Sequence, residues 1–250
     1  MLKKRIIPIV LLDGFSVLKT IKFSERRNLG SPITVLRTYN TRNVDELILL
    51  DIDASKDNRA IDIFTVQEIA SECFMPLTVG GGLKSIDDIA LALSKGADKV
   101  SINSGALDNP GLIQDSARNF GSQSIVVSID VISENGKYHI FKKGQIYKAI
   151  ELEDWCKQVS SLGAGELLIN SVNLDGTMAG GDVVLAEKIS LLVDIPVIYS
   201  GGISGPQNCV ELGATNISAL GIASIFHFTN ITPLDCKIEM SRNNLPVRLS

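Results

Sequence analysis

The segment Glu46-Leu47-Ile48-Leu49-Leu50-Asp51 is an apolar run of the length of a buried strand, and Glu166-Leu167-Leu168-Ile169 repeats it about 120 residues later. Two glycine-containing segments recur at nearly the same spacing: Gly80-Gly81-Gly82 with Ser200-Gly201-Gly202, and Gly96-Ala97 with Gly213-Ala214. A repeat of this length indicates two similar halves that follow the same order of strands, turns and helices.

Short β-branched runs alternate along the whole chain with longer stretches that suit one helix each. The predicted strands are Ile6–Leu11, Glu46–Asp51, Leu77–Val79, Lys99–Ile102, Ser124–Asp130, Glu166–Asn170, Val197–Ser200 and Ile217–Leu220. Eight such units in 250 residues predict an α/β fold, a closed (β/α)8 barrel built from two half-barrels. We expect one domain over residues 1–250, because no low-complexity linker divides the chain.

Local signals refine this fold in two places. Ser85-Ile86-Asp87-Asp88 predicts a helix that begins with a capping box, and Gly96 predicts its end. After the fifth strand, Asn135-Gly136 within residues 131–141 is a strong hairpin signal, so we expect a β-hairpin over the barrel mouth.

Composition excludes several classes of function. The formal net charge is -4 and no basic block is present, so we expect no nucleic-acid partner. No apolar run is long enough to span a membrane, and the N-terminus is interpreted as a first strand. The 4 cysteines contain no C-x-x-C pair, which fits a reducing cytoplasm. With only 2 histidines, we expect no metal site, and no cofactor.

Glycines follow the third and seventh predicted strands, where barrels bind ligands. Gly82 and Gly202 end these glycine groups, and glycines there let backbone N–H groups approach a phosphate. Further donors follow strands four and eight: Asn103, Ser104, Gly105, Ala223 and Ser224. The alternative is that the glycines only make tight turns. Asp175-Gly176-Thr177 after strand six is either a turn or a second phosphate contact.

Asp130 ends the apolar run of the fifth strand, at the end of the barrel where catalytic groups lie. We favour a catalytic acid there over a helix cap or a hairpin anchor. The equivalent first strand, Ile6–Leu11, ends in leucine, so one acid stands where the repeat would supply two. Asp51 and Asp53, which end the second strand, either serve the site or cap Ser55.

Two other charged groups point to function. Arg5, Glu46, Lys99 and Glu166 fall at or just before strand starts; they are either scattered surface charges or a ring at the barrel bottom, where buried charges need partners. The segment Asp13–Pro32 is long and polar and holds the cations Lys19, Lys22, Arg26 and Arg27. It is either a solvated loop or a lid for an anionic substrate.

A set of ordered motifs covers nearly the whole chain. They are Lys4-Arg5-Ile6-Ile7-Pro8, Asp45-Glu46-Leu47, Leu50-Asp51-Ile52, Thr78-Val79-Gly80-Gly81-Gly82, Gly96-Ala97-Asp98-Lys99-Val100-Ser101-Ile102-Asn103, Phe120-Gly121-Ser122-Gln123, Gly163-Ala164-Gly165-Glu166, Asp175-Gly176-Thr177 and Ser224-Ile225-Phe226-His227-Phe228. With these motifs the sequence resembles the cyclase subunit of imidazole glycerol phosphate synthase, the HisF family.

The resemblance implies a (β/α)8 barrel that receives ammonia from a glutaminase subunit docked at the bottom and uses it at the top. It implies that Arg5, Glu46, Lys99 and Glu166 form an ammonia gate, that Asp98 faces the glutaminase, and that Asp130 is one of two catalytic acids. The implied phosphate-binding residues are Gly82, Asn103 and Ser104 at one site and Gly176, Thr177, Gly202, Ala223 and Ser224 at the other, with Lys19 and Asp175 as further substrate contacts.

The sequence departs from the family at the first acid, which belongs three residues after Pro8, at Leu11. Leucine cannot transfer protons. Asp13 has the same strand parity and is the candidate replacement, although Gly14 follows it as in an Asp-Gly turn. Asn170 also stands where the family usually has threonine. The sequence is therefore similar to a paralogous branch that keeps the ammonia supply and helps to convert an acetamido sugar to an acetamidino sugar for surface glycans.

Three functions follow as alternatives. The first is an ammonia-using synthase subunit that pairs with a glutaminase and acts on a phosphorylated acceptor, a nucleotide-linked sugar. The second is a genuine imidazole glycerol phosphate synthase cyclase of histidine biosynthesis, with Asp13 as the second acid. The third is a non-catalytic scaffold that activates a glutaminase.

Overall fold

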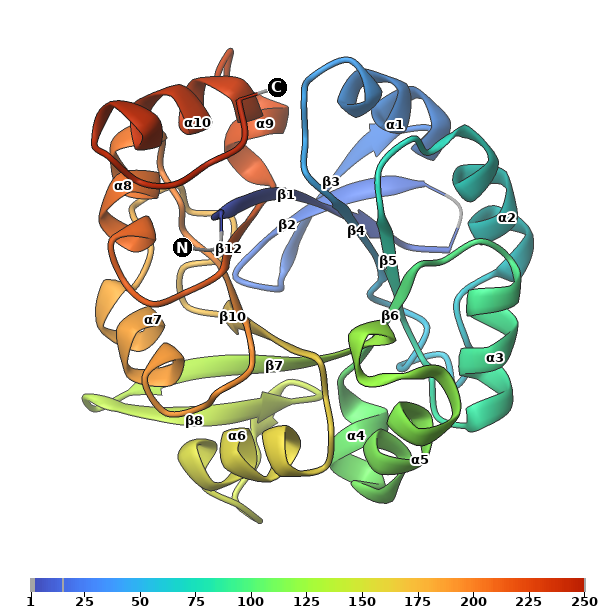
Figure 1. Cartoon of the computed structure of the whole chain (residues 1–250). Helices are drawn as coiled ribbons and strands as arrows, with labels where there is room; N and C mark the ends of the chain where they lie inside the picture. The colour runs from blue at the N-terminus through green and yellow to red at the C-terminus, as the bar shows by residue number, and fades with distance from the viewer. Residues whose placement is uncertain (1–2, 15, 250) are drawn as a thin grey trace.

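Eight parallel strands form a closed barrel surrounded by helices in the computed structural model, which describes residues 3–14 and 16–249 (Figure 1). The barrel strands are β1 (Arg5–Leu12), β4 (Leu47–Asp51), β5 (Leu77–Gly80), β6 (Lys99–Ile102), β7 (Ile125–Glu134), β10 (Glu166–Ser171), β11 (Val197–Ser200) and β12 (Ala219–Ile222). Each overlaps one of the eight predicted strands, although β12 begins two residues later than predicted and β7 continues four residues past Asp130. The (β/α)8 barrel is confirmed. Met1, Leu2, Phe15 and Ser250 belong to the predicted domain, and Phe15 to the predicted lid, but they lie outside the described residues.

The strand order fixes which strands face one another across the barrel. Around the barrel it is β1-β4-β5-β6-β7-β10-β11-β12, and β12 returns to β1 through the parallel pair Arg5↔Ala219. β1 and β7 therefore lie on opposite walls. These are the strands that carry Leu11 and Asp130.

The helices lie outside the barrel, and their bounds follow the sequence signals. They are α1 (Pro32–Asn40), α2 (Ile63–Glu72), α3 (Ile86–Ser94), α4 (Ser104–Asp108), α5 (Gly111–Phe120), α6 (Leu152–Ser161), α7 (Val183–Ser190), α8 (Pro206–Gly213), α9 (Ser224–Phe228) and α10 (Pro233–Arg242), with a 3-10 turn at Ser122–Ser124. The predicted capping box at Ser85 and Asp88 is formed, and Gly96 lies just beyond the end of that helix. None of the helices in the described part of the chain has the length and apolarity needed to cross a membrane.

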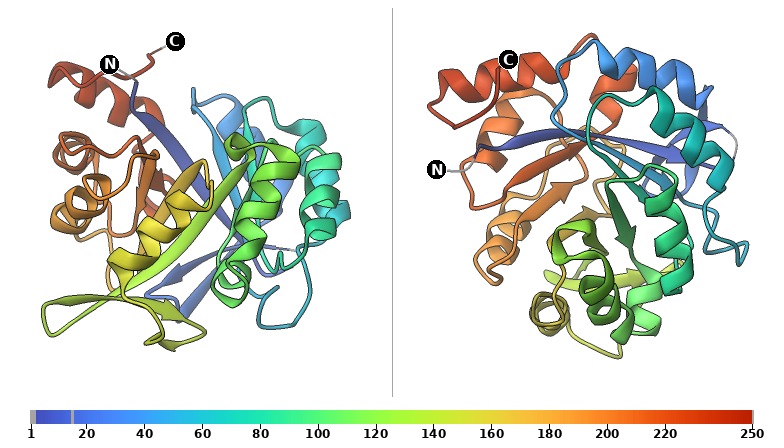
Figure 2. Two further views of the ribbon diagram at one scale, coloured as in Figure 1. Left: turned by 60° about the horizontal axis from the view of Figure 1, so that its bottom comes forward. Right: turned by 45° about the vertical axis from the view of Figure 1, so that its right-hand side comes forward.

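Two hairpins extend from the strand-end face, opposite the two chain termini (Figure 2). The predicted one is confirmed: β7 continues past Asp130 and pairs with β8 (Lys137–Lys142) through the Asn135-Gly136 turn. The interpretation of Asp13–Pro32 as a loop is wrong for most of its length, because β2 (Val17–Ile21) and β3 (Glu25–Gly30) form a second hairpin. Its first strand is buried and pairs with β1, so burial and backbone pairing order a segment whose composition is polar.

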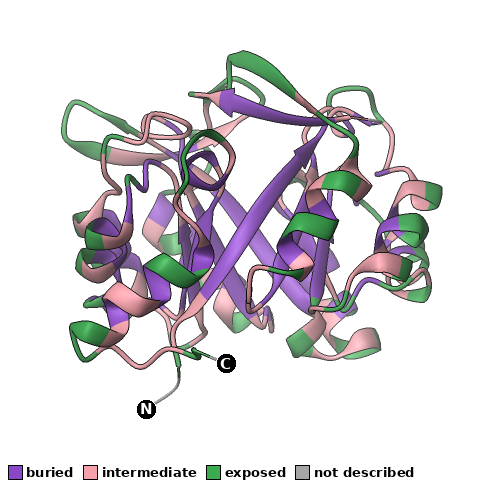
Figure 3. Cartoon of the chain, turned by 90° about the horizontal axis from the view of Figure 1, so that it is seen from above, coloured by how far each residue is buried: buried purple, intermediate pink, exposed green. Residues whose placement is uncertain are grey.

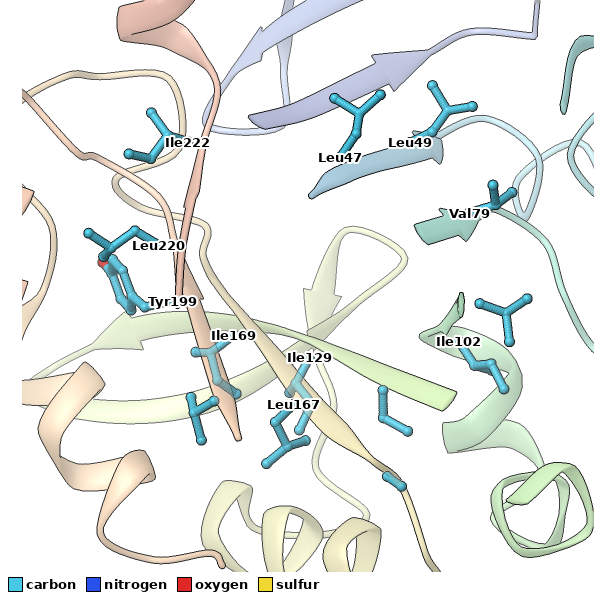
Figure 4. Close-up of a cluster of buried hydrophobic side chains, with 14 of the residues drawn as sticks. Leu47, Leu49, Val79, Ile102, Ile129, Leu167, Ile169, Tyr199, Leu220 and Ile222 are labelled. Carbon is cyan, nitrogen blue, oxygen red and sulfur yellow. The ribbon is translucent and has the colours of Figure 1, made fainter. Parts of the chain in front are cut away.

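Alternation along the strands divides the apolar side chains into two cores. On β1, Ile6, Val10 and Leu12 face outward, whereas Ile7 and Ile9 face the barrel interior. The outer core fills the space between barrel and helices and is the larger one; Figure 4 shows part of it, and Figure 3 shows how continuously the strands are buried. The barrel interior is thus a packed core with a site at one end.

The two halves repeat in space as well as in sequence. A Cβ added at Gly81 would lie 2.6 Å from the carbonyl oxygen of Asp51, and one added at Gly201 would lie 2.7 Å from that of Ser171. Both glycines have positive φ angles, of 131° and 111°. Only glycine fits these turns, which bring the backbone against the preceding barrel strand at equivalent points of each half.

Candidate functional site

Four charged side chains meet in a ring at the strand-start end of the barrel. Arg5 donates hydrogen bonds to Glu46 Oε1 at 2.7 Å and to Glu166 Oε2 at 2.8 Å. Lys99 Nζ lies 3.0 Å from Glu46 Oε2 and 2.6 Å from Glu166 Oε1. Each cation thus contacts both anions, and these four side chains form a ring instead of scattered surface charges.

The ring stabilises the charged forms of its members. Burial lowers the pKa of Arg5, but the hydrogen bonds and charges of Glu166 and Glu46 outweigh it and raise the pKa above its ordinary value. Burial likewise raises the pKa of Glu166, and the hydrogen bonds and charges of Arg5 and Lys99 outweigh it and bring the pKa below its ordinary value. Arg5 and Glu166 therefore stay ionised at neutral pH.

Apolar side chains fill the barrel between the ring and the mouth. Ile7, Ile48, Val126, Leu168 and Ile198 form this inner cluster and are almost completely buried. An ion would lose its hydration in such surroundings, whereas a small neutral molecule would lose little.

A cavity of about 770 Å³ opens at the mouth, and Asp130 lies in its wall. The carboxylate accepts hydrogen bonds from Asn103 Nδ2 at 2.8 Å and from Asn170 Nδ2 at 3.0 Å. Burial raises the pKa of Asp130 to about 6, against these two hydrogen bonds, which lower it. A carboxyl group with this pKa is ionised at neutral pH and can exchange a proton with a bound substrate.

An apolar patch lies on the wall opposite Asp130, beside the ion-paired Asp51 and Asp53. Ile9 and Leu11 on β1 and Leu50 and Ile52 from the β4 region line the same cavity. Leu11 is 9% exposed and packs with the inner cluster. The cavity therefore presents the Asp130 carboxylate on one wall and, opposite it, an apolar patch that suits an alkyl group.

The predicted phosphate-binding residues fall into two places. Gly82, Asn103 and Ser104 line the large cavity. Gly176, Gly202, Ala223 and Ser224 line an adjoining cleft of about 20 Å³, and Ala223 borders both spaces. Thr177 lines neither space, and its hydroxyl donates to the Leu174 carbonyl at 2.8 Å.

Lys19 and Asp175 join the β2–β3 hairpin to the barrel wall. Lys19 Nζ lies 2.8 Å from Asp175 Oδ1, and the Thr20 hydroxyl donates to Asp175 Oδ2 at 2.7 Å. Lys19 is only 2% exposed, so the pair is an internal contact at the boundary of the two spaces. The Lys22 backbone N–H also donates to the Asp175 carbonyl, which holds the hairpin in place.

The remaining predicted aspartates take different positions. Asp13 accepts a hydrogen bond from the Ser16 N–H at 3.0 Å in the turn after β1 and does not line the large cavity. Asp98 is exposed at the strand-start face, where its carboxylate accepts from the Leu77 N–H at 2.8 Å. Asp51 pairs with Arg59 at 2.6 Å, and Asp53 pairs with Arg26 at 2.5 Å.

Sequence reasoning missed the polar network that sets the Asp130 environment. The sequence marks Asn170 only as a departure from the family pattern and Asn103 only as a predicted phosphate ligand. In the structure both side-chain amides donate hydrogen bonds to the Asp130 carboxylate. A signal for this contact was present: both asparagines come at the ends of strands that pair with β7, so their side chains could be expected beside Asp130. The Arg59 partner of Asp51 had no such signal, because it lies in an irregular loop. Within residues 3–14 and 16–249, no group of three His, Cys, Asp or Glu side chains is placed to hold a metal ion.

Known proteins show the same sequence pattern over the full length. The histidine biosynthesis protein family model matches residues 5–232. A Campylobacter jejuni protein, named provisionally as imidazole glycerol phosphate synthase subunit hisF2, is 44% identical over 249 residues, covering 100% of both chains. Imidazole glycerol phosphate synthase subunits HisF of an Exiguobacterium and a Hydrogenobaculum species are each 42% identical, covering 99% and 100% of this chain and 97% and 100% of their own.

Proposed function

The chain belongs to the histidine biosynthesis family and to its HisF type, and from that premise we propose that it uses ammonia from a glutaminase to amidinate the acetamido group of a nucleotide-linked sugar. The observation that carries the choice of acceptor is Leu11, which stands on the wall opposite Asp130. An acceptor that needs two acids on opposite walls would find Asp130 on β7 and a leucine on β1.

The barrel supports ammonia delivery along its axis. The ring of Arg5, Glu46, Lys99 and Glu166 closes the strand-start end, and the inner apolar cluster separates it from the Asp130 cavity. Neutral ammonia can cross such a core, while ammonium and other ions are disfavoured. In this proposal the ring is the gate for ammonia and the glutaminase docks around it.

Asp130 suits the chemistry of amidine formation. The ammonia nitrogen bonds to the amide carbon and gives up two protons, while the carbonyl oxygen takes up two protons and leaves as water. At least one proton must therefore pass from the nitrogen to a nearby base. With a pKa of about 6, Asp130 is ionised at neutral pH and acts as the base that takes this proton. The alkyl wall of Leu11, Leu50 and Ile52 receives the acetamido methyl group.

A gene deletion in the source organism tests the proposal. Loss of acetamidino sugars from the surface glycans, measured by mass spectrometry, together with growth in the absence of histidine, is the expected result. The 42% identity to proteins named HisF favours the second candidate, a histidine-pathway cyclase. Histidine auxotrophy with unchanged glycans would establish that candidate instead.

Leu11→Asp tests the missing acid directly. We expect the wild-type chain, supplied with ammonium, to convert the histidine-pathway ribulose intermediate about two to four orders of magnitude more slowly than a cyclase with both acids. Leu11→Asp should recover part of that activity, and Leu11→Asn, equally polar but without an acid, should not. Robust wild-type turnover that Asp13→Asn abolishes would show instead that Asp13 is the second acid.

Asp98→Asn tests the docking face. The amide oxygen can still accept the Leu77 N–H, so the fold is kept while the charge is removed. We expect about tenfold weaker glutaminase binding, read from titrations of glutamine-dependent activity, with ammonium-dependent activity unchanged. Asp87→Asn, an exposed aspartate on α3, is the matched control. An equal fall in both activities would place Asp98 in the fold or the active site.

A further inference from the structure

Five side chains at the cavity mouth, here called the rim cluster, have no role in the function proposed so far. They are Lys22, Phe23, Lys56, Phe141 and Lys143, and all line the large cavity. They come from three separate connections: the β2–β3 turn, the loop after β4, and the end of β8 with its turn. The cluster therefore exists only because the fold brings these connections together.

Contacts between the connections hold the cluster in place. Phe23 and Phe141 make an edge-to-face pair with ring centroids 6.5 Å apart, which joins the two hairpins. Arg26 of β3 binds Asp53 of the β4 loop through two hydrogen bonds of 2.5 and 2.6 Å. None of these contacts involves the three lysines of the cluster.

The three lysines are exposed and unpaired. In the part of the chain that the structure describes, no ion pair or side-chain hydrogen bond links Lys22, Lys56 or Lys143 to another residue. Neighbouring cations differ: Arg26, Arg59 and Lys142 all have carboxylate partners. Three exposed ammonium groups without an ion-pair partner, one of them (Lys56) near enough to Asp53 to lower the pKa of that carboxyl, surround one aromatic pair. They suit a ligand that carries several negative charges and a planar ring.

The cluster borders the residues of the first half-barrel that are predicted to bind a phosphate. Lys142 Nζ lies 2.6 Å from Asp108, the last residue of α4, which fixes the end of β8 beside the helix that begins at Ser104. Lys84 Nζ donates to Asn58 Oδ1 at 2.6 Å, which joins the loop after Gly82 to the loop that carries Lys56. One cavity thus runs from the rim cluster past Gly82 and Ser104 to Asp130.

We propose that the rim cluster binds the nucleoside diphosphate portion of the acceptor. The diphosphate lies between Lys56 and Lys143 beside Gly82 and Ser104, the base stacks on Phe23, and the sugar extends down to Asp130. Phe23 is 40% exposed, so a ring face is open to a base. The cavity volume of about 770 Å³ is of the size that holds such a ligand. The sugar part of this assignment rests on the proposed function, whereas nucleotide binding does not.

Calorimetric titration of the full-length chain with ADP, CDP, GDP and UDP, and with inorganic pyrophosphate, tests the proposal. At least one nucleoside diphosphate should bind about tenfold or more tightly than pyrophosphate, because base stacking adds to the phosphate contacts. Phe23→Leu and Phe141→Leu should each remove most of that advantage and leave pyrophosphate binding unchanged. Lys56→Ala with Lys143→Ala should weaken both ligands at least about tenfold.

Matched controls lie elsewhere on the surface. Phe74→Leu changes an exposed phenylalanine, 84% accessible, in the α2–β5 connection, and Lys157→Ala changes an exposed lysine on α6. Both should bind as the wild type does. Nucleoside diphosphates that bind no better than pyrophosphate, or an advantage that survives both leucine variants, would overturn the assignment. If nucleotide binding follows the expected pattern but no acetamidino sugar is formed, the rim cluster is a nucleotide site and the proposed reaction is wrong.

Discussion

Asp130→Asn should lower ammonia-dependent turnover by about two to four orders of magnitude, because among the described residues it removes the one carboxylate of the cavity wall that is not held in an ion pair. The asparagine has nearly the same shape and still fits between Asn103 and Asn170. In the wild type, the rate should rise with pH through about 6, where Asp130 loses its proton and becomes a base. The pH profile of kcat with ammonium as the nitrogen donor measures both effects.

The same substitution should raise stability at neutral pH. The folded-state pKa of Asp130, about 6, lies above its ordinary value of 3.8, so the folded state holds a proton that the unfolded chain has lost. Wild-type stability therefore falls as pH rises from about 4 to about 6, by roughly 3 kcal/mol in total. Asparagine is uncharged, so burial does not destabilise it in this way. Its NH2 group cannot accept a hydrogen bond, so one of the two hydrogen bonds is lost, which costs about 1 kcal/mol.

Urea unfolding at several pH values separates these contributions. Asp130→Asn should be more stable than the wild type by about 2 kcal/mol at pH 7.5, and the difference should vanish near pH 4. Asp115→Asn, an exposed aspartate on α5, is the control for both measurements. If the variant kept full activity, Asp130 would have no part in the chemistry. If the gain in stability did not depend on pH, burial of the Asp130 charge would not be its cause.

Arg5→Ala should destabilise the fold by about 2–4 kcal/mol, because it leaves Glu46 and Glu166 with Lys99 as their one remaining cation in the ring. The two glutamate side chains are only 11% and 10% exposed, so water cannot replace the guanidinium. Arg5→Lys keeps the charge, but one ammonium group cannot replace the two guanidinium nitrogens that bind Glu46 and Glu166. We therefore expect an intermediate loss of stability.

The pH dependence identifies the cause of this loss. The folded-state pKa of Glu166 lies below its ordinary 4.5, so its contribution to stability is present above that pH and is lost as pH falls through the folded-state value. The Arg5→Ala deficit should therefore be largest at neutral pH and shrink toward pH 4 in chemical denaturation. Arg37→Ala, which breaks the exposed pair with Glu72, should change little at any pH. A deficit that does not depend on pH would mean that Arg5 acts through packing.

The barrel could be predicted because its signals are local and repeated. Each strand, such as Glu46–Asp51, is a short apolar run, and the recurrence of Glu46 as Glu166 and of Gly81 as Gly201 requires two equivalent half-barrels. The ring charges could be named for the same reason, since strand starts of a parallel barrel meet at one end. The β2–β3 hairpin was missed because β2 (Val17–Ile21) does not alternate between apolar and polar residues and β3 is polar. Its order comes from pairing with β1.

What the sequence by itself determined is the list of parts: eight strands, the glycine turns, one acid at Asp130 and a leucine in place of its twin. Only the tertiary structure decided which of these residues interact and how strongly. The pKa of Asp130 depends on burial and on the amides of Asn170 in β10 and of Asn103 just after β6. The ring depends on four strand starts that meet within hydrogen-bond distance. The rim cluster depends on three connections that are far apart in the chain. Electrostatic and packing energies depend on distances in space, which no spacing along a sequence can supply.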